Sequence, residues 1–189
     1  MWCAMKPTLV ILVLAGATIV AAGTFPVSQA DVRVMCPMTI GGTFAAKTTA
    51  LSGSLTAGTN RSPVFDGSLA VDLRTLGTGI SLRDEHLRET YLEVDRAPGY
   101  DKAILSEIDL KGLNPDAPEG KGSFTGSLLL HGVKKTVTGS VDVHKAGDGL
   151  KVKASFPVNL SDYNIAEPRY LGVGVKNTVQ IEVIFTSTP

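Results

Sequence analysis

The sequence predicts an all-β protein that contains one amphipathic helix. Three observations support this prediction. Short runs in which apolar and polar residues alternate follow one another along most of the chain. Glycine is abundant, with 20 residues, and charged residues make up only 19%, a composition that favours a domain with many tight turns. The alternation is interrupted once by a compact, charged segment at about residues 80–92.

The first part of the chain has the features of a cleavable signal peptide. Lys6 precedes a nearly unbroken apolar run from Leu9 to Ala22, and Ser28-Gln29-Ala30 offers small residues for cleavage. A membrane anchor is the alternative, but the run is short for a span and no basic cluster follows it. We therefore expect an exported protein, periplasmic or secreted, with a signal peptide at 1–30 and one domain at 31–189. No permanent membrane span is expected after cleavage.

Cleavage would leave Cys36 as the only cysteine, because Cys3 lies in the leader. We therefore expect no disulfide within the mature chain. Cys36 is expected to be a small buried hydrophobic residue, with a free reactive thiol as the alternative. These features carry no prediction of the oligomeric state.

The strands are predicted from the alternation, in chain order. They cover residues 32–36, 43–56 with a break near Gly53, 64–73, 103–113, 123–130, 134–145, 150–157 and 178–186. Turns at Gly41-Gly42, His131-Gly132 and Ala146–Gly149 separate several of them. Such an antiparallel sheet either packs as a sandwich or closes into a barrel. Closure would leave no exposed edge, and a barrel of about eight strands has room for one ligand.

Residues 80–92 are predicted to form the helix. At about 100° per residue, Ile80, Leu87 and Tyr91 fall on one apolar stripe. Ser81 and Asp84 have the spacing of a capping box at its start. Because the stripe is narrow, we expect this helix to lie against a sheet. Residues 161–165 are expected to form a short one-turn element.

Four motifs follow one another between Leu55 and the C-terminus. They are FDGSLAVDL at 65–73, TGISLRDEHLR at 78–88, GSLLLHGVKKTV at 126–137 and DYNI at 162–165. In this order they resemble the YceI-like family of exported polyisoprenoid-binding proteins. The resemblance implies an antiparallel, lipocalin-like β-barrel whose apolar interior holds an isoprenoid or fatty-acyl chain. The segment Val32–Cys36 departs from the aromatic-rich first strand that the family usually has, which affects the N-terminal side of the pocket.

The interior of the barrel is the predicted binding site. Its candidate residues are apolar and occupy alternating strand positions: Phe65, Leu69, Val71, Ile104, Ile108, Phe124, Leu128, Phe156, Val158, Ile181 and Val183. Aromatic residues are scarce, at 6%, so a mainly aliphatic lining would suit a flexible hydrocarbon better than a planar ligand. The alternative is that these residues fill a solid core, since alternation alone does not identify the inward face.

Arg83 and Asp84 are the charged pair of interest on the helix. In one interpretation they lie at the pocket and position a polar head group such as a phosphate, hydroxyl or amide. In the other, which we favour from the sequence, Arg83 pairs with Asp72 or Asp162 and fixes the helix to the rim of the barrel, because charges beside a core-facing stripe need partners.

Other classes of function are disfavoured by the composition. The 18 basic and 18 acidic residues balance, and no basic run is present for nucleic acid. His86, His131 and His144 lack the spacing of metal ligands, and His131 is expected to be a turn residue that bonds its own backbone. The chain contains no G-x-S-x-G nucleophile motif. We expect no catalytic residue, metal or cofactor.

The predicted function is therefore non-covalent binding of one amphiphilic lipid, an isoprenoid or fatty-acid derivative. Two alternatives belong to other classes. A filled barrel would serve as an interaction module for another exported protein, whereas a hydrolase or isomerase would act on a lipid-like substrate. A continuous cavity distinguishes the first alternative from a lipid carrier, and perturbed acid–base residues would mark the second.

Overall fold

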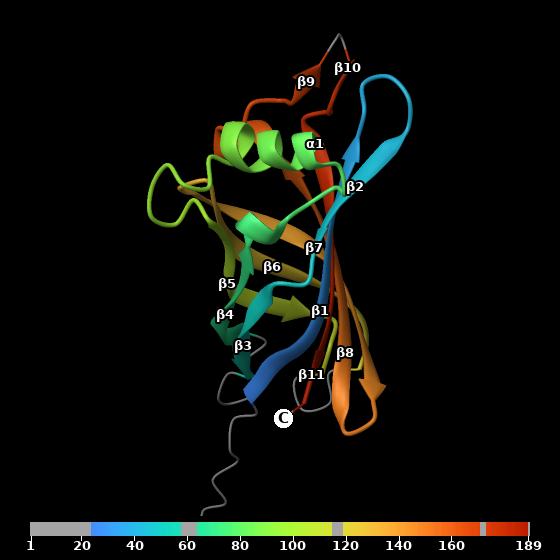
Figure 1. The fold of residues 1–189 in the computed structure, drawn as a ribbon. Helices are drawn as coiled ribbons and strands as arrows, with labels where there is room; N and C mark the ends of the chain where they lie inside the picture. The colour runs from blue at the N-terminus through green and yellow to red at the C-terminus, as the bar shows by residue number, and fades with distance from the viewer. Residues whose placement is uncertain (1–23, 58–63, 115–118, 171–172, 189) are drawn as a thin grey trace, which may run out of the picture.

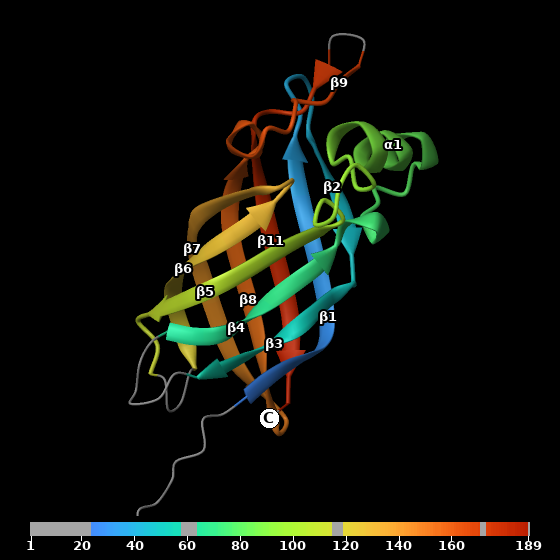
Figure 2. The same cartoon turned by 90° about the vertical axis from the view of Figure 1, so that its left-hand side faces the viewer.

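Eight strands close into an antiparallel barrel, and a short helix lies across one open end (Figures 1 and 2). The computed structural model describes residues 24–57, 64–114, 119–170 and 173–188. The order around the ring is β1, β3, β4, β5, β6, β7, β8 and β11, and β11 pairs with β1 to complete it. The predicted all-β barrel with one inserted helix is confirmed.

The elements follow the predicted order along the chain. The strands are β1 (Thr24–Pro37), β2 (Thr43–Thr48), β3 (Leu51–Ala57), β4 (Val64–Asp72), β5 (Lys102–Lys111), β6 (Gly120–Leu130), β7 (Val133–Ala146), β8 (Gly149–Asn159), β9 (Arg169–Tyr170), β10 (Val173–Gly174) and β11 (Thr178–Ser187). The helical elements are the 3₁₀ turn η2 (Leu73–Thr75), the helix α1 (Ser81–His86), the π-helical turn η3 (Leu87–Tyr91) and the 3₁₀ turn η4 (Leu160–Tyr163).

Strand β1 closes the barrel because it is long enough to pair with three neighbours. It runs beside β11 from Val27 to Met35, while its first residues, Thr24–Pro26, pair with β3. Its second half, from Val32 to Pro37, pairs with β2. The strand begins eight residues before the predicted start at residue 32, so the predicted cleavage after Ala30 falls inside it.

The inward face of β5 changes along the strand because of a bulge. The pairing between β5 and β6 shifts between Ser106 and Asp109, where β5 carries one extra residue. Glu107 within this bulge has a φ angle of 53°, in the left-handed region. Strict alternation therefore fails here, and residues 104 and 108 do not share a face.

The helix begins differently from the predicted capping box. Ile80 occupies the N-cap position, and no side chain bonds to the helix start there. Asp84 instead reaches back to the preceding turn at Thr78 and Gly79. The predicted span of 80–92 is divided between α1 and the π-helical η3. The predicted one-turn element near residue 161 is confirmed as η4. In the part of the chain that the structure describes, no helix is long and apolar enough to cross a membrane.

Candidate functional site

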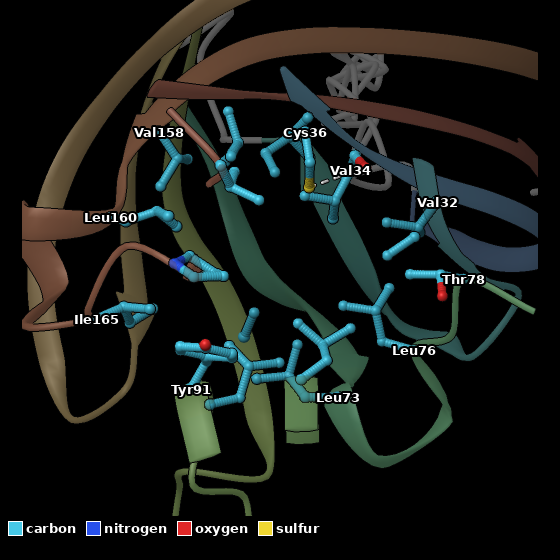
Figure 3. A pocket seen from close by; sticks show the side chains of 18 of the residues that line it. Val32, Val34, Cys36, Leu73, Leu76, Thr78, Tyr91, Val158, Leu160 and Ile165 are labelled. Carbon is cyan, nitrogen blue, oxygen red and sulfur yellow. Dashed lines mark hydrogen bonds between the residues drawn. The ribbon is translucent and has the colours of Figure 1, made fainter. Parts of the chain in front are cut away.

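A cavity of about 730 Å³ occupies the barrel beneath α1. Side chains from the barrel strands and from the segments above them converge on it, as Figure 3 shows for Val32, Cys36, Leu73 and Val158. Nearly all of its lining side chains are apolar. A second, smaller cavity of about 90 Å³ lies toward the opposite end of the barrel, near the start of β1 and the end of β11. We call them the upper and the lower cavity.

Ten of the eleven apolar residues singled out from the sequence line one of these cavities. Those in the upper cavity are Leu69, Val71, Leu128, Phe156, Val158, Ile181 and Val183. Those in the lower cavity are Phe65, Ile108 and Phe124, together with Leu69, which lines both. Ile104 lines neither, and its position differs from the prediction because the β5 bulge puts Ala103 and Leu105 on the cavity side instead.

Several lining residues were not singled out from the sequence. Val32, Val34 and Cys36 on β1 face the upper cavity, as do Phe44 and Ala46 on β2. The alternation of Val32, Val34 and Cys36 was a usable signal for this face. Leu73, Leu76 and Ile165 lie outside the regular strands, so no strand pattern could have identified them.

The mouth of the upper cavity is formed by α1 and η3. Ile80, Leu87 and Tyr91, the predicted apolar stripe, all line the cavity. Polar side chains join them at the same end, from Thr78, Arg83, His86, Thr90 and Arg169. Among the described residues, the large hydrophobic side chains that are exposed are Ile40, Ile80, Leu82 and Val173, and all four belong to segments at this end (Figure 1). The mouth thus combines apolar and cationic groups.

Asp84 fixes the turn that leads into α1. Its carboxylate accepts hydrogen bonds from the backbone N–H of Thr78 and from Thr78 Oγ1, both at 2.6 Å, and from the N–H of Gly79 at 3.3 Å. Burial opposes its ionisation, but these hydrogen bonds outweigh it and lower the pKa of Asp84. Asp84 therefore has the geometry of a structural clamp.

Arg83 has a different environment. Its guanidinium lies 4.5 Å from the centroid of the Phe44 ring, a cation–π arrangement between α1 and β2. The carboxylates predicted to pair with it have other partners, since Asp72 accepts from the backbone N–H of Arg74 and Asp162 from the Asn159 amide. No described carboxylate forms an ion pair with Arg83. Its charge is thus available at the mouth of the cavity.

Cys36 is buried in the wall of the upper cavity. Its thiol lies 3.6 Å from the carbonyl oxygen of Val34. Burial raises the pKa of this thiol to about 11, although the charge of Arg83 acts in the opposite direction. Because the thiolate is the reactive form, this environment favours a packing role over a reactive one.

His131 joins residues 81–93, which comprise α1, η3 and the two residues after them and which we call the lid, to the barrel. Its ring is buried, with Nδ1 at 2.9 Å from the carbonyl oxygen of Tyr163 and Nε2 at 3.0 Å from Glu93 Oε2. The Tyr100 ring packs beside it, with centroids 4.6 Å apart. The expected bond to its own backbone is therefore replaced by bonds that join the β6–β7 turn to the segment after η3 and to η4. A cluster of three or more potential metal ligands is absent from the described residues.

Glu93 is held by two donors at this junction. Arg96 donates to it at 2.6 Å and His131 lies on the same carboxylate oxygen. The hydrogen bond from Arg96 is the largest influence on the pKa of Glu93 and lowers it. Burial acts to raise this pKa and the hydrogen bond with His131 acts to lower it, so the net effect is a lowered pKa. A lowered pKa means that the ionised carboxylate stabilises the fold above its usual pKa, and this contribution is lost as the pH falls through the folded-state value.

We predict that Glu93→Gln lowers the free energy of unfolding at neutral pH and that the loss shrinks under acid conditions, where Glu93 of the parent is protonated. Chemical unfolding at several pH values measures this. Glu107→Gln is the matched control, since Glu107 pairs with Lys134 on the exposed surface and such pairs contribute little. Equal losses in the two variants would contradict a specific role for the Glu93–His131 junction.

Several solved structures have a fold similar to that of this chain. No curated protein matches the chain in sequence. BcnA of Burkholderia cenocepacia has a similar structure, with a TM-score of 0.65 and 17% identity over 84% of this chain and 96% of that chain. A polyisoprenoid-binding domain from Saccharophagus degradans, described as implicated in plant cell wall breakdown, has a TM-score of 0.61 and 15% identity over 87% and 98%. The YceI protein of Campylobacter jejuni has a TM-score of 0.53 and 16% identity over 74% and 81%.

At these identities the structural likeness shows the fold, and the family follows from the sequence itself. The sequence-family model of the YceI-like domain matches residues 23–186 of the chain. This match runs from the start of β1 to Thr186, one residue before the end of β11, and includes the lid. The chain therefore belongs to the YceI-like family.

Proposed function

We propose that this protein binds one amphiphilic lipid, an isoprenoid or fatty-acid derivative, non-covalently in the upper cavity. The observation that carries the proposal is the 730 Å³ cavity with its nearly all-apolar lining. Protein interiors normally pack without voids of this size. The Saccharophagus degradans structure, described as a polyisoprenoid-binding domain, supports the same class of ligand for this chain.

The hydrocarbon chain supplies the affinity in this proposal. Each methylene that is moved from water into an apolar site contributes about 0.8 kcal/mol. A flexible chain is the ligand best suited to the cavity, because Val, Leu and Ile side chains line most of it. The cavity also disfavours the filled-barrel interaction module, since that function needs no void.

The polar end of the lipid lies at the mouth in this proposal. Arg83 offers a guanidinium with no carboxylate partner among the described residues, and His86 lies on the same helix facing the same cavity. A phosphate or carboxylate head group would complement Arg83. Asp84 is assigned the structural role, because its oxygens already accept bonds from the Thr78–Gly79 turn.

Export is also part of the proposal, with the N-terminal apolar segment as its signal. We propose a processing site different from the one after Ala30, because Thr24–Pro26 pairs with β3 and Phe25 packs against Phe65 with ring centroids 6.2 Å apart. Cleavage after Ala30 would remove these interactions from the barrel. These contacts support processing on the N-terminal side of Thr24.

We predict that the mature protein recovered from an exporting host begins at or before Thr24. N-terminal sequencing and intact mass spectrometry identify the first residue of the protein. Both are applied to the exported fraction and to the unfractionated culture. A mature chain that begins at Asp31 would support cleavage after Ala30 and overturn the revised site. An unprocessed chain in every fraction would contradict export through a cleaved signal.

We predict that Leu128→Trp blocks lipid uptake without unfolding the protein. Leu128 is buried and lines the upper cavity, so the added ring would occupy the space that the hydrocarbon needs. Native mass spectrometry and organic extraction measure bound lipid in the parent and the variant, and thermal unfolding measures stability. In a filled core the same change would cost about 1–3 kcal/mol through overpacking.

The matched control for this experiment is Leu129→Trp. Leu129 is the next residue on β6 and lines neither cavity, so lipid uptake should persist in this variant. A parent protein that carries no extractable lipid and takes up none, together with a destabilised Leu128→Trp variant, would contradict the carrier function.

We predict that Arg83→Gln weakens binding of a fatty acid about tenfold, equivalent to about 1.4 kcal/mol, and leaves stability close to that of the parent. A fatty alcohol with the same chain should bind both proteins nearly equally, because it lacks the charge. Titration calorimetry measures the affinities. Arg88→Gln is the control for a structural arginine, since Arg88 donates to the carbonyl of Leu76. Lost stability with unchanged affinity in Arg83→Gln would assign Arg83 a structural role instead.

A further inference from the structure

The lower cavity is a separate apolar space inside the barrel, next to the upper cavity and farther from α1. It has a volume of about 90 Å³, and its lining side chains come from β1, β3, β4, β5, β6, β7, β8 and β11. Four residues, Leu69, Leu105, Ala154 and Phe185, line both cavities. At these four positions a single layer of side chains separates the two cavities.

An aromatic pair lies at this boundary. Phe156 lines the upper cavity and Phe124 lines the lower one, and their rings meet edge to face with centroids 5.6 Å apart. Gly139 on β7 makes room for this pair. A Cβ at that position would lie 2.7 Å from each of the two phenylalanine side chains and would collide with the carbonyl oxygen of Ser155.

The walls of the lower cavity are more aromatic than those of the upper cavity. Four of the six phenylalanines in the sequence line it, namely Phe25, Phe65, Phe124 and Phe185. Such side chains have few rotamers and form rigid walls. An apolar cavity of about 150 Å³ stays dry and binds small apolar molecules, and the lower cavity is a smaller space with the same kind of lining. The lower cavity therefore has the chemistry of a site for the end of a hydrocarbon chain.

We propose that the lower cavity receives the distal end of the lipid tail and thereby sets a preference for chain length. This inference rests on the proposed lipid-binding function. Small movements of Leu69, Leu105 or Phe185 would join the two spaces, since each of these side chains already faces both. Short chains would end in the upper cavity, whereas longer chains would extend past the Phe124–Phe156 pair.

The test is the dependence of affinity on chain length. A series of straight-chain fatty acids is titrated into lipid-free full-length mature protein. Each methylene added within an apolar site should tighten binding about fourfold, the equivalent of about 0.8 kcal/mol. In the parent this gain should continue through the longer acids. In Val143→Phe it should stop at a shorter chain, because the added ring fills the lower cavity, while shorter acids should keep their parental affinity.

Val183→Phe is the matched control, because Val183 lines only the upper cavity. It should weaken binding of short and long acids alike. Val143 is tightly buried, so Val152→Phe provides a second variant. Val152 is half-buried, pairs with Val143 across β7 and β8, and also lines the lower cavity. Thermal unfolding identifies which variants are folded.

The possible outcomes separate this inference from the proposed function. A shortened chain-length limit in either folded lower-cavity variant, with short acids unaffected, supports the inference. Unchanged affinities for the longest acids in folded Val143→Phe and Val152→Phe overturn it and leave lipid binding in place. Absence of binding by the parent across the whole series overturns both proposals.

Discussion

The pairing of β1 with β11 is the interaction on which the rest of the structure depends. Through it the sheet becomes a closed ring, so one face of every long strand is directed into a shared interior. The strands are held apart by the barrel geometry, and the inward residues are too small to fill the space between them. Val32, Val183 and Ala154 are examples from β1, β11 and β8. The cavity is thus a consequence of closure combined with modest side-chain volume.

At the mouth, hydrogen bonds position the lid without a large buried interface. No residue of α1 or η3 is fully buried, so packing alone provides little to hold this segment. Asp84 fixes its beginning through Thr78 and Gly79, and Glu93 fixes its end through His131. A segment held at its two ends in this way can yield between them more easily than a strand of the barrel can. Under the proposed function, that arrangement suits an opening through which the lipid would pass.

Much of the fold was predictable because antiparallel strands with one apolar face have a clear period of two residues. The Val179, Ile181, Val183 and Phe185 positions on β11 are an example, and all of them are on the cavity side or in the core. The two-residue period fails where the strand contains an extra residue, as at Glu107. For this reason Ile104 was predicted to face the interior, whereas it does not line either cavity. The partners of Arg83, Asp84 and His131 were not predictable, because they depend on which turns meet at the mouth. The start of β1 was missed because Thr24–Ala30 was interpreted as part of a leader.

The two ends of the barrel differ chemically, and this difference gives the interior a direction. Arg83, His86 and Thr78 lie at the α1 end, whereas Phe25, Phe65 and Phe124 lie at the other. A charged head group placed at the phenylalanine end would lose its hydration without gaining a partner, at a cost of several kcal/mol. At the α1 end the same group would retain contact with water and with Arg83. Under the proposed function, an amphiphile should therefore enter the barrel tail first, and the mouth would select the head group while the depth of the interior would select the tail.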